Sequence, residues 1–154
     1  MRSYSVLMVF ALAFVVLLGL QFLPWQTFGA ETSVSVDVDP DTLNLGMYGM
    51  WITVYIGPPD EYGIGDIDVS TVKLEGVLSP ELWDLQDDKL IMKFNADDVI
   101  GRIWLKISHM GVPMQIMPED SVPVELTVTG ELNDGTSFVG SDEIQVIAPS
   151  LPSV

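Results

Sequence analysis

The sequence predicts an all-β protein: an immunoglobulin-like antiparallel β-sandwich of about seven strands, preceded by a signal peptide. Three observations point to this class. Apolar and polar residues alternate through most of the chain, connections rich in Gly and Pro separate the alternating runs, and an uncharged apolar stretch comes first. Alternation with a period of two is typical of antiparallel strands that have one buried face. Short strands with frequent turns favour a sandwich.

The first 30 residues have the order of a secretory signal peptide. Arg2 precedes the uncharged residues 6–20, and a short stretch with Pro24 in it ends at Ala30. A basic start, an apolar centre and small residues at the cleavage site define such a signal. The alternative is an uncleaved membrane anchor over residues 6–23, a length that barely crosses a bilayer. Both interpretations export the remainder, so we expect an extracellular or cell-surface location.

The exported part is expected to be one β-sandwich domain over residues 31–148, with a disordered tail over residues 149–154. Strands are expected where apolar residues recur at every second position. The predicted inward positions, in order, are Val34, Val36 and Val38; Met50, Ile52, Val54 and Ile56; Val72 and Leu74; Leu90, Met92 and Phe94; Ile103, Leu105 and Ile107; and Val124, Leu126 and Val128.

Two short stretches could hold a helical turn. They read "SPELWDL" at residues 79–85 and "ADDVIG" at residues 96–101. In the first, Ser79 can cap a turn that has Pro80 at its first helical position. The rest of the domain is expected to consist of strands and turns.

The last two apolar runs are predicted to form a hairpin. Its turn is expected at Asp134-Gly135, because glycine accepts the positive φ that tight hairpin turns need. Gly140 interrupts the second run and predicts a bulge or bend. Glu125 and Glu131 fall on the polar face of their strand. The acids of this hairpin are therefore interpreted as solvated residues, not as a site.

The exported part is strongly acidic. Of the six basic residues, only Arg2 precedes residue 31, whereas all 22 acidic residues lie after residue 30. The exported part therefore has a net charge of −17. Such a charge repels nucleic acid and anionic lipid, so neither is expected as a partner. A membrane contact is expected only through residues 6–23, if they stay attached. The chain has no cysteine, so a packed core must supply its stability.

Three blocks resemble a β-sandwich accessory module that recurs in secreted and surface proteins of archaea and bacteria. They are "VDVDPDTLNL" at residues 36–45, "IDVSTVKLEG" at 67–76 and "VTGELNDGTSFVGSDEIQVI" at 128–147. The resemblance covers roughly residues 34–147 and implies a β-sandwich without enzymatic activity. Many members of this module carry an acidic, glycine-rich calcium loop between the second and third blocks. This chain has "LWDLQDDKLIMKF" there, without the glycines.

That stretch also holds the best candidates for a metal site, Asp84, Asp87 and Asp88. Clustered carboxylates favour calcium over transition metals. A calcium loop needs a glycine for its sharp turn, however, and the alternative is a solvated loop of an acidic protein. We therefore expect no cofactor, with calcium as the one candidate. Further acidic candidates are Asp97 with Asp98, and Asp37 with Asp39 and Asp41.

Trp51 and Tyr55 are candidates for ligand binding. They share one face of a predicted strand, and flat aromatic rings can stack on sugars. The alternative is that both rings are buried against the second sheet. His109 is the one histidine of the chain and has no candidate nucleophile near it in the sequence. Because a catalytic triad needs a base between a nucleophile and an acid, we predict that the chain is not an enzyme.

Together these observations predict a non-enzymatic exported module that acts as an adhesion, envelope or scaffold component. Its expected partners are other surface or extracellular proteins, or polysaccharide. One alternative is a carbohydrate- or polymer-binding module that uses Trp51 and Tyr55. Another is a subunit of an extracellular filament, in which the early strand at residues 32–38 pairs with a neighbouring chain.

Overall fold

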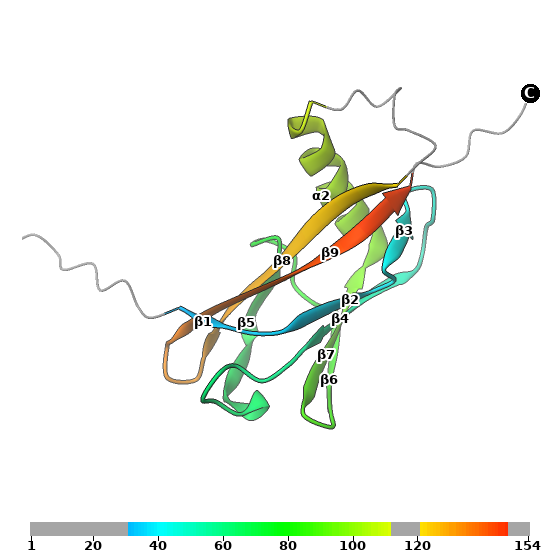
Figure 1. Ribbon diagram of the computed structural model, residues 1–154. Helices are drawn as coiled ribbons and strands as arrows, with labels where there is room; N and C mark the ends of the chain where they lie inside the picture. The colour runs from blue at the N-terminus through cyan, green and yellow to red at the C-terminus, as the bar shows by residue number, and fades with distance from the viewer. Residues whose placement is uncertain (1–30, 112–120, 148–154) are drawn as a thin grey trace, which may run out of the picture.

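Two β-sheets lie face to face in the computed structural model, which describes residues 31–111 and 121–147 (Figure 1). Sheet A has the strand order β1-β9-β8-β5, with β3 also paired to β9, and sheet B has the order β2-β4-β7-β6. The prediction of an all-β sandwich is confirmed at this level. The elements are β1 (Thr32–Ser33), β2 (Val36–Asp39), β3 (Thr42–Asn44), β4 (Trp51–Ile56), the 3₁₀ turn η2 (Ile64–Asp66), β5 (Ile67–Leu74), β6 (Leu82–Gln86), β7 (Lys89–Asn95), α2 (Ala96–His109), β8 (Val122–Leu132) and β9 (Ser137–Ile147).

The space between the sheets is filled by apolar side chains from alternate strand positions. Among the described residues, no polar or charged residue is buried. The predicted alternation is confirmed in every run except the one around Leu105, although Met50 precedes its strand and is exposed. The largest fully buried side chains include Phe94, Phe138, Leu43, Ile52, Ile56, Leu74, Leu90 and Met92.

The N-terminal segment of the domain pairs with both sheets in turn. β1 runs parallel to β9, β2 runs antiparallel to β4, and β3 returns to run parallel to β9. The Val38 amide of β2 also donates to Asp142 Oδ2 of β9 at 2.8 Å. This segment therefore joins the two layers, and two of its three pairings depart from the purely antiparallel arrangement that the sequence predicts.

Gly140 marks the place where this segment crosses β9. The predicted bulge is wrong, because the pairing of β8 with β9 continues in one register through Val128 and Gly140. A β-carbon on Gly140 would instead lie 2.5 Å from the Val34 carbonyl oxygen and 2.6 Å from Val36 Cγ2. The glycine is needed because another stretch of backbone passes directly over it.

The run around Leu105 is a helix and not the predicted strand. Helix α2 begins at the N-cap Asn95, whose side chain accepts a hydrogen bond from the Asp97 amide at 2.9 Å. Ile103 and Ile107 are buried, but Leu105 is 49 % exposed. Residues four apart share one face of a helix, whereas the residue midway between them lies on the other face. The predicted helical turn in "ADDVIG" is confirmed as the start of this longer helix.

The other predicted helical turn, "SPELWDL", is wrong. Residues 82–86 form strand β6, which pairs antiparallel with β7. Leu82 lies opposite Lys93 at one end of this pairing, and Gln86 lies opposite Lys89 at the other. No helix directly follows Ser79, and its Oγ accepts a hydrogen bond from Lys73 Nζ at 2.6 Å. The cross-strand partners on β7 decide the conformation of this stretch, and the sequence pattern around Pro80 does not show them.

The closing hairpin has the predicted turn. Gly135 has a φ of +87°, and its amide donates to the Leu132 carbonyl at 2.8 Å. The Leu132 amide then donates to the Thr136 carbonyl at 2.8 Å, which closes a loop of three residues. Such loops combine a turn with a residue in the left-handed conformation, a position that glycine fills without steric cost.

A partly buried ion pair attaches α2 to sheet A. Lys106 Nζ lies 2.8 Å from Glu75 Oε1, and the Glu75 side chain is only 8 % exposed. The same carboxylate oxygen accepts the Thr127 amide of β8 at 2.9 Å. Lys106 Nζ also donates to the Glu125 carbonyl oxygen. A carboxylate with both a charged and a backbone donor is well compensated for its burial.

Two predictions concern segments outside the described residues: the signal peptide or anchor over residues 1–30, and the tail over residues 149–154. Within residues 31–111 and 121–147, no helix is long and apolar enough to cross a membrane.

Candidate functional site: the outer face of sheet B

The outer face of sheet B carries two rows of side chains that cross all four strands. Successive side chains of a strand point to opposite faces, and Val38, Val54 and Met92 point into the core. Their neighbours therefore point outward, and the strand register places them side by side. The first row is Asp37, Tyr55, Ile91 and Asp84, and the second row is Asp39, Thr53, Lys93 and Leu82.

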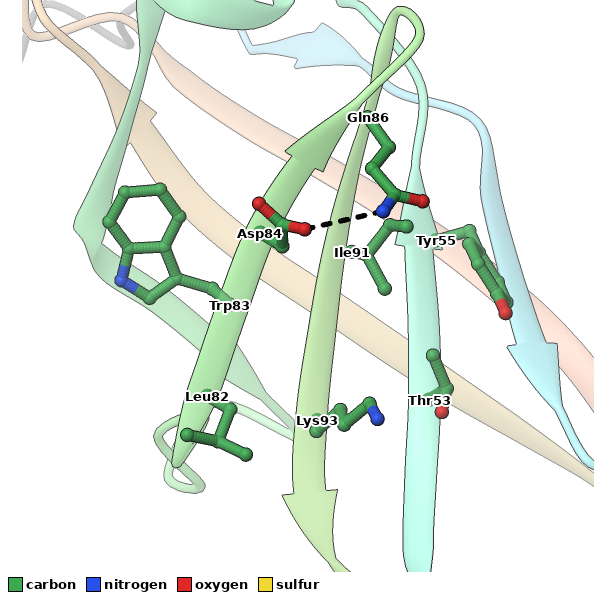
Figure 2. A pocket seen from close by; sticks show the side chains of 8 residues that line it. All are labelled: Thr53, Tyr55, Leu82, Trp83, Asp84, Gln86, Ile91 and Lys93. Atoms are coloured by element: carbon green, nitrogen blue, oxygen red, sulfur yellow. Dashed lines mark hydrogen bonds between the residues drawn. The ribbon is translucent and has the colours of Figure 1, made fainter.

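Three surface hollows on this face meet at Tyr55. The first, of about 430 Å³, lies over β4, β7 and β6, and Figure 2 shows the side chains that line it. The second, of about 540 Å³, lies toward the β6–β7 turn. The third, of about 430 Å³, lies over β2 and is lined by Asp37, Asp39, Asp41, Tyr55 and Lys89. Tyr55 is thus the aromatic centre of one open face.

Charges of both signs surround this tyrosine. Lys89 Nζ lies 5.9 Å from the centre of the Tyr55 ring, a distance at which a cation is attracted to the ring face. Lys93 lies in the adjoining row, and Asp37 and Asp84 stand at the two ends of the row of Tyr55. The face therefore offers hydrogen-bond donors and acceptors on both sides of a flat ring.

The two aromatic residues predicted to bind a ligand both lie on this outer face. Trp51 is 41 % exposed and Tyr55 is partly exposed, so neither ring is buried against sheet A. Trp51 pairs with Asn95 at the far end of β4 and lines none of the three hollows. Sequence reasoning did not assign Lys93, Gln86 or Ile91 to the site, because the register of β6 and β7 places them there.

The three predicted metal ligands have other roles on the β6–β7 hairpin. Asp84 Oδ1 accepts the Leu85 amide at 2.9 Å, and its Oδ2 accepts Gln86 Nε2 at 3.4 Å (Figure 2). Asp87, with a φ of +49°, and Asp88 form the two-residue turn. Within the described ranges, no three His, Cys, Asp or Glu side chains are grouped as metal ligands. The calcium site stays a prediction.

Of the other acidic candidates, Asp37, Asp39 and Asp41 line the third hollow, whereas Asp97 and Asp98 lie apart from the β6–β7 hairpin. Asp97 and Asp98 occupy the first turn of α2, where the helix dipole stabilises negative charge. Asp134 is in the turn of the closing hairpin, and its Oδ1 accepts the Thr136 amide at 2.9 Å. This hydrogen bond, assisted by the Thr136 side chain and by the Tyr62 hydroxyl, lowers the pKa of Asp134.

Comparison with known proteins adds no assignment. No protein-family model matches the chain, and no curated protein matches it.

Proposed function

We propose that the chain is a non-enzymatic exported module that is displayed outside the cell or at its surface, as a component of an adhesion, envelope or scaffold structure. The signal-like residues 1–30, the net charge of −17 after them and the resemblance to a recurrent surface module support this proposal. We also propose an immunoglobulin-like sandwich, since two mostly antiparallel sheets face each other and the first strand pairs with the last. The proposal assigns no catalytic residue and no cofactor.

The main structural support for this proposal is the outer face of sheet B. Its three hollows adjoin one another at Tyr55 and are open to solvent over all four strands. Sites for small molecules are usually concave and enclose most of the ligand. An open face with one aromatic residue and flanking charges is suited to binding the surface of another macromolecule or an extended polymer, because it can contact such a partner without enclosing it.

Binding to isolated cell envelopes of the producing organism tests the proposal. The labelled protein is expected to bind, and Tyr55→Ala is expected to weaken binding at least about tenfold, as the loss of a central aromatic contact does. Tyr48→Ala is the matched control, because Tyr48 is 79 % exposed and lines none of these hollows. Equal losses in the two variants, or no binding by the parent, would contradict the proposed role of this face.

Carbohydrate or another polymer is the second candidate partner, and the surroundings of Tyr55 favour it. A partly exposed ring beside carboxylates and a lysine presents both a stacking surface and hydrogen-bonding groups to a sugar. Lys89 lies over the ring, so a neutral sugar must displace it. Lys89→Ala is therefore expected to strengthen binding of a neutral polysaccharide in affinity electrophoresis and to weaken binding of an acidic one. A panel without any binding polysaccharide would remove this candidate.

The filament alternative requires a rearrangement. The segment at residues 32–38 pairs with β9 and β4 of its own domain. It would have to leave these partners and pair with a neighbouring chain, as in domain swapping. Light scattering at rising protein concentration tests this, and a persistent monomer would exclude it.

A further inference from the structure

Strand β6 is an edge of sheet B, and its inward-facing side chains are only half covered. Trp83 and Leu85 pair with Met92 and Leu90, which are fully buried, so the alternation of the sheet directs them to the same inner face. Yet Trp83 is 56 % exposed and Leu85 is 45 % exposed. Figure 2 shows the Trp83 ring turned away from Asp84 and the other residues of the hollow, beyond the edge of the strand.

The backbone of β6 also has a free side. The Asp87-Asp88 turn joins Gln86 to Lys89, and the residues that flank a two-residue turn form a hydrogen-bonded pair. Because hydrogen bonding alternates along an antiparallel pair, Asp84 and Leu82 bond to β7, whereas the amide and carbonyl groups of Trp83 and Leu85 point off the edge. The Leu85 amide is held there by the carboxylate of Asp84, at 2.9 Å.

The charges around this edge select the kind of strand that could join it. Asp84 is central on β6, Asp87 and Asp88 follow it, and the exported part has a net charge of −17. A second copy that paired antiparallel about Asp84 would place two aspartates directly opposite each other, which destabilises a sheet. A strand with lysine or arginine at that position would instead form an opposite-charge pair.

We propose that the β6 edge binds an extended segment of another protein whose basic and apolar side chains alternate, and that this segment adds a fifth strand to sheet B. Its apolar side chains cover Trp83 and Leu85 on the inner face. Its basic side chain lies opposite Asp84 on the outer face and draws the carboxylate away from the Leu85 amide, which then donates to the added strand. Addition of a strand to an exposed edge is an established mode of peptide recognition.

Two synthetic peptides of equal composition test this proposal, one alternating lysine with valine and one with its lysines and valines in separate blocks. The alternating peptide is expected to bind the parent protein at least about tenfold more tightly in calorimetric titration, a difference of about 1.4 kcal/mol. It is also expected to slow hydrogen exchange at residues 82–86. Equal affinity for the two peptides would mean that charge alone attracts them, and would overturn the proposal.

Two variants with the same change of net charge locate the site. Asp84→Lys is expected to weaken the alternating peptide at least about tenfold and to gain affinity for a peptide that alternates glutamate with valine. Asp60→Lys, at an exposed loop position, is expected to change either affinity less than about twofold. Equal losses in both variants would overturn the proposal. So would a concentration-dependent dimer of the parent that protects residues 82–86, because it would give this edge to a second copy.

Discussion

Replacement of Gly140 by alanine should damage the fold far more than such a small change usually does. The added β-carbon would lie 2.5 Å from the Val34 carbonyl oxygen, 2.6 Å from Val36 Cγ2 and 2.7 Å from Val34 Cγ2. Non-bonded carbon atoms prefer roughly 3.5–4.0 Å, so residues 34–36 would have to move away from β9 by about 1 Å. This movement strains the hydrogen bond from the Val34 amide to the Val139 carbonyl, which measures 3.0 Å.

The expected loss follows from these contacts. Overpacking costs roughly 1–3 kcal/mol, and a lost backbone hydrogen bond adds about 1 kcal/mol, so we expect Gly140→Ala to lower the free energy of unfolding by about 2–4 kcal/mol. Urea unfolding followed by circular dichroism measures it. Gly101→Ala is the control, because Gly101 is exposed on α2 and its β-carbon would meet nothing within 4 Å. That variant is expected to stabilise the protein by roughly 0.5–1 kcal/mol, since alanine is the better helix former. A Gly140→Ala protein as stable as the parent would refute the crossing of the N-terminal segment over this residue.

Three further predictions concern charge. Lys106→Ala should lower the free energy of unfolding by roughly 3 kcal/mol, because it leaves the Glu75 carboxylate, only 8 % of whose side chain is exposed, without its cation; Glu75→Gln, which still accepts both donors, should cost less in the same urea titration. Asp134 has a lowered pKa in the fold, so its stabilising contribution is present above its ordinary pKa, near 3.9, and is lost as the pH falls through the lowered value. The melting temperature of Asp134→Asn should therefore decrease less than that of the parent as the pH is lowered into the acid range. An equal decrease in both proteins would contradict this. Monovalent salt should raise the melting temperature smoothly by screening the net charge of −17 on residues 31–154, without an additional step at low millimolar calcium; a calcium-specific rise that Asp84→Asn with Asp87→Asn removes would establish the calcium site instead.

Local patterns were sufficient for the strands that form the core. Ile52, Val54 and Ile56 are buried as the alternation predicts, and Gly135 has the positive φ that its turn requires. These features depend on neighbours in the sequence, which is why they could be predicted. The helix could have been found as well, because Val99, Ile100 and the buried isoleucines after them recur with helical spacing from residue 96 onward.

The complete site could not be predicted, because its residues come from several strands and no single segment of the sequence shows how these strands pair. Tyr55 was recognised as a candidate on the outward face of its strand, but Lys93 and Asp84 come to lie on the same face only through the register of two other strands. The bulge predicted at Gly140 was wrong for the same reason, since the backbone that passes over it is about a hundred residues earlier in the chain. Pairing between distant segments determines both the surroundings of Tyr55 and those of Gly140, and the alternation within one strand contains no information about that pairing.

The segment that pairs with both sheets also constrains when this protein can finish folding. Its bond from Val38 to Asp142 joins residues 104 positions apart, and β1 and β3 both need β9 as a partner. Contacts of such high sequence separation form slowly, because a long loop must close first. The N-terminal segment can therefore join the two layers only after β9 has become available. If the chain crosses a membrane from its N-terminus, β1 and β3 stay without their partner until β9 has followed, so the sandwich can be completed only on the far side of the membrane.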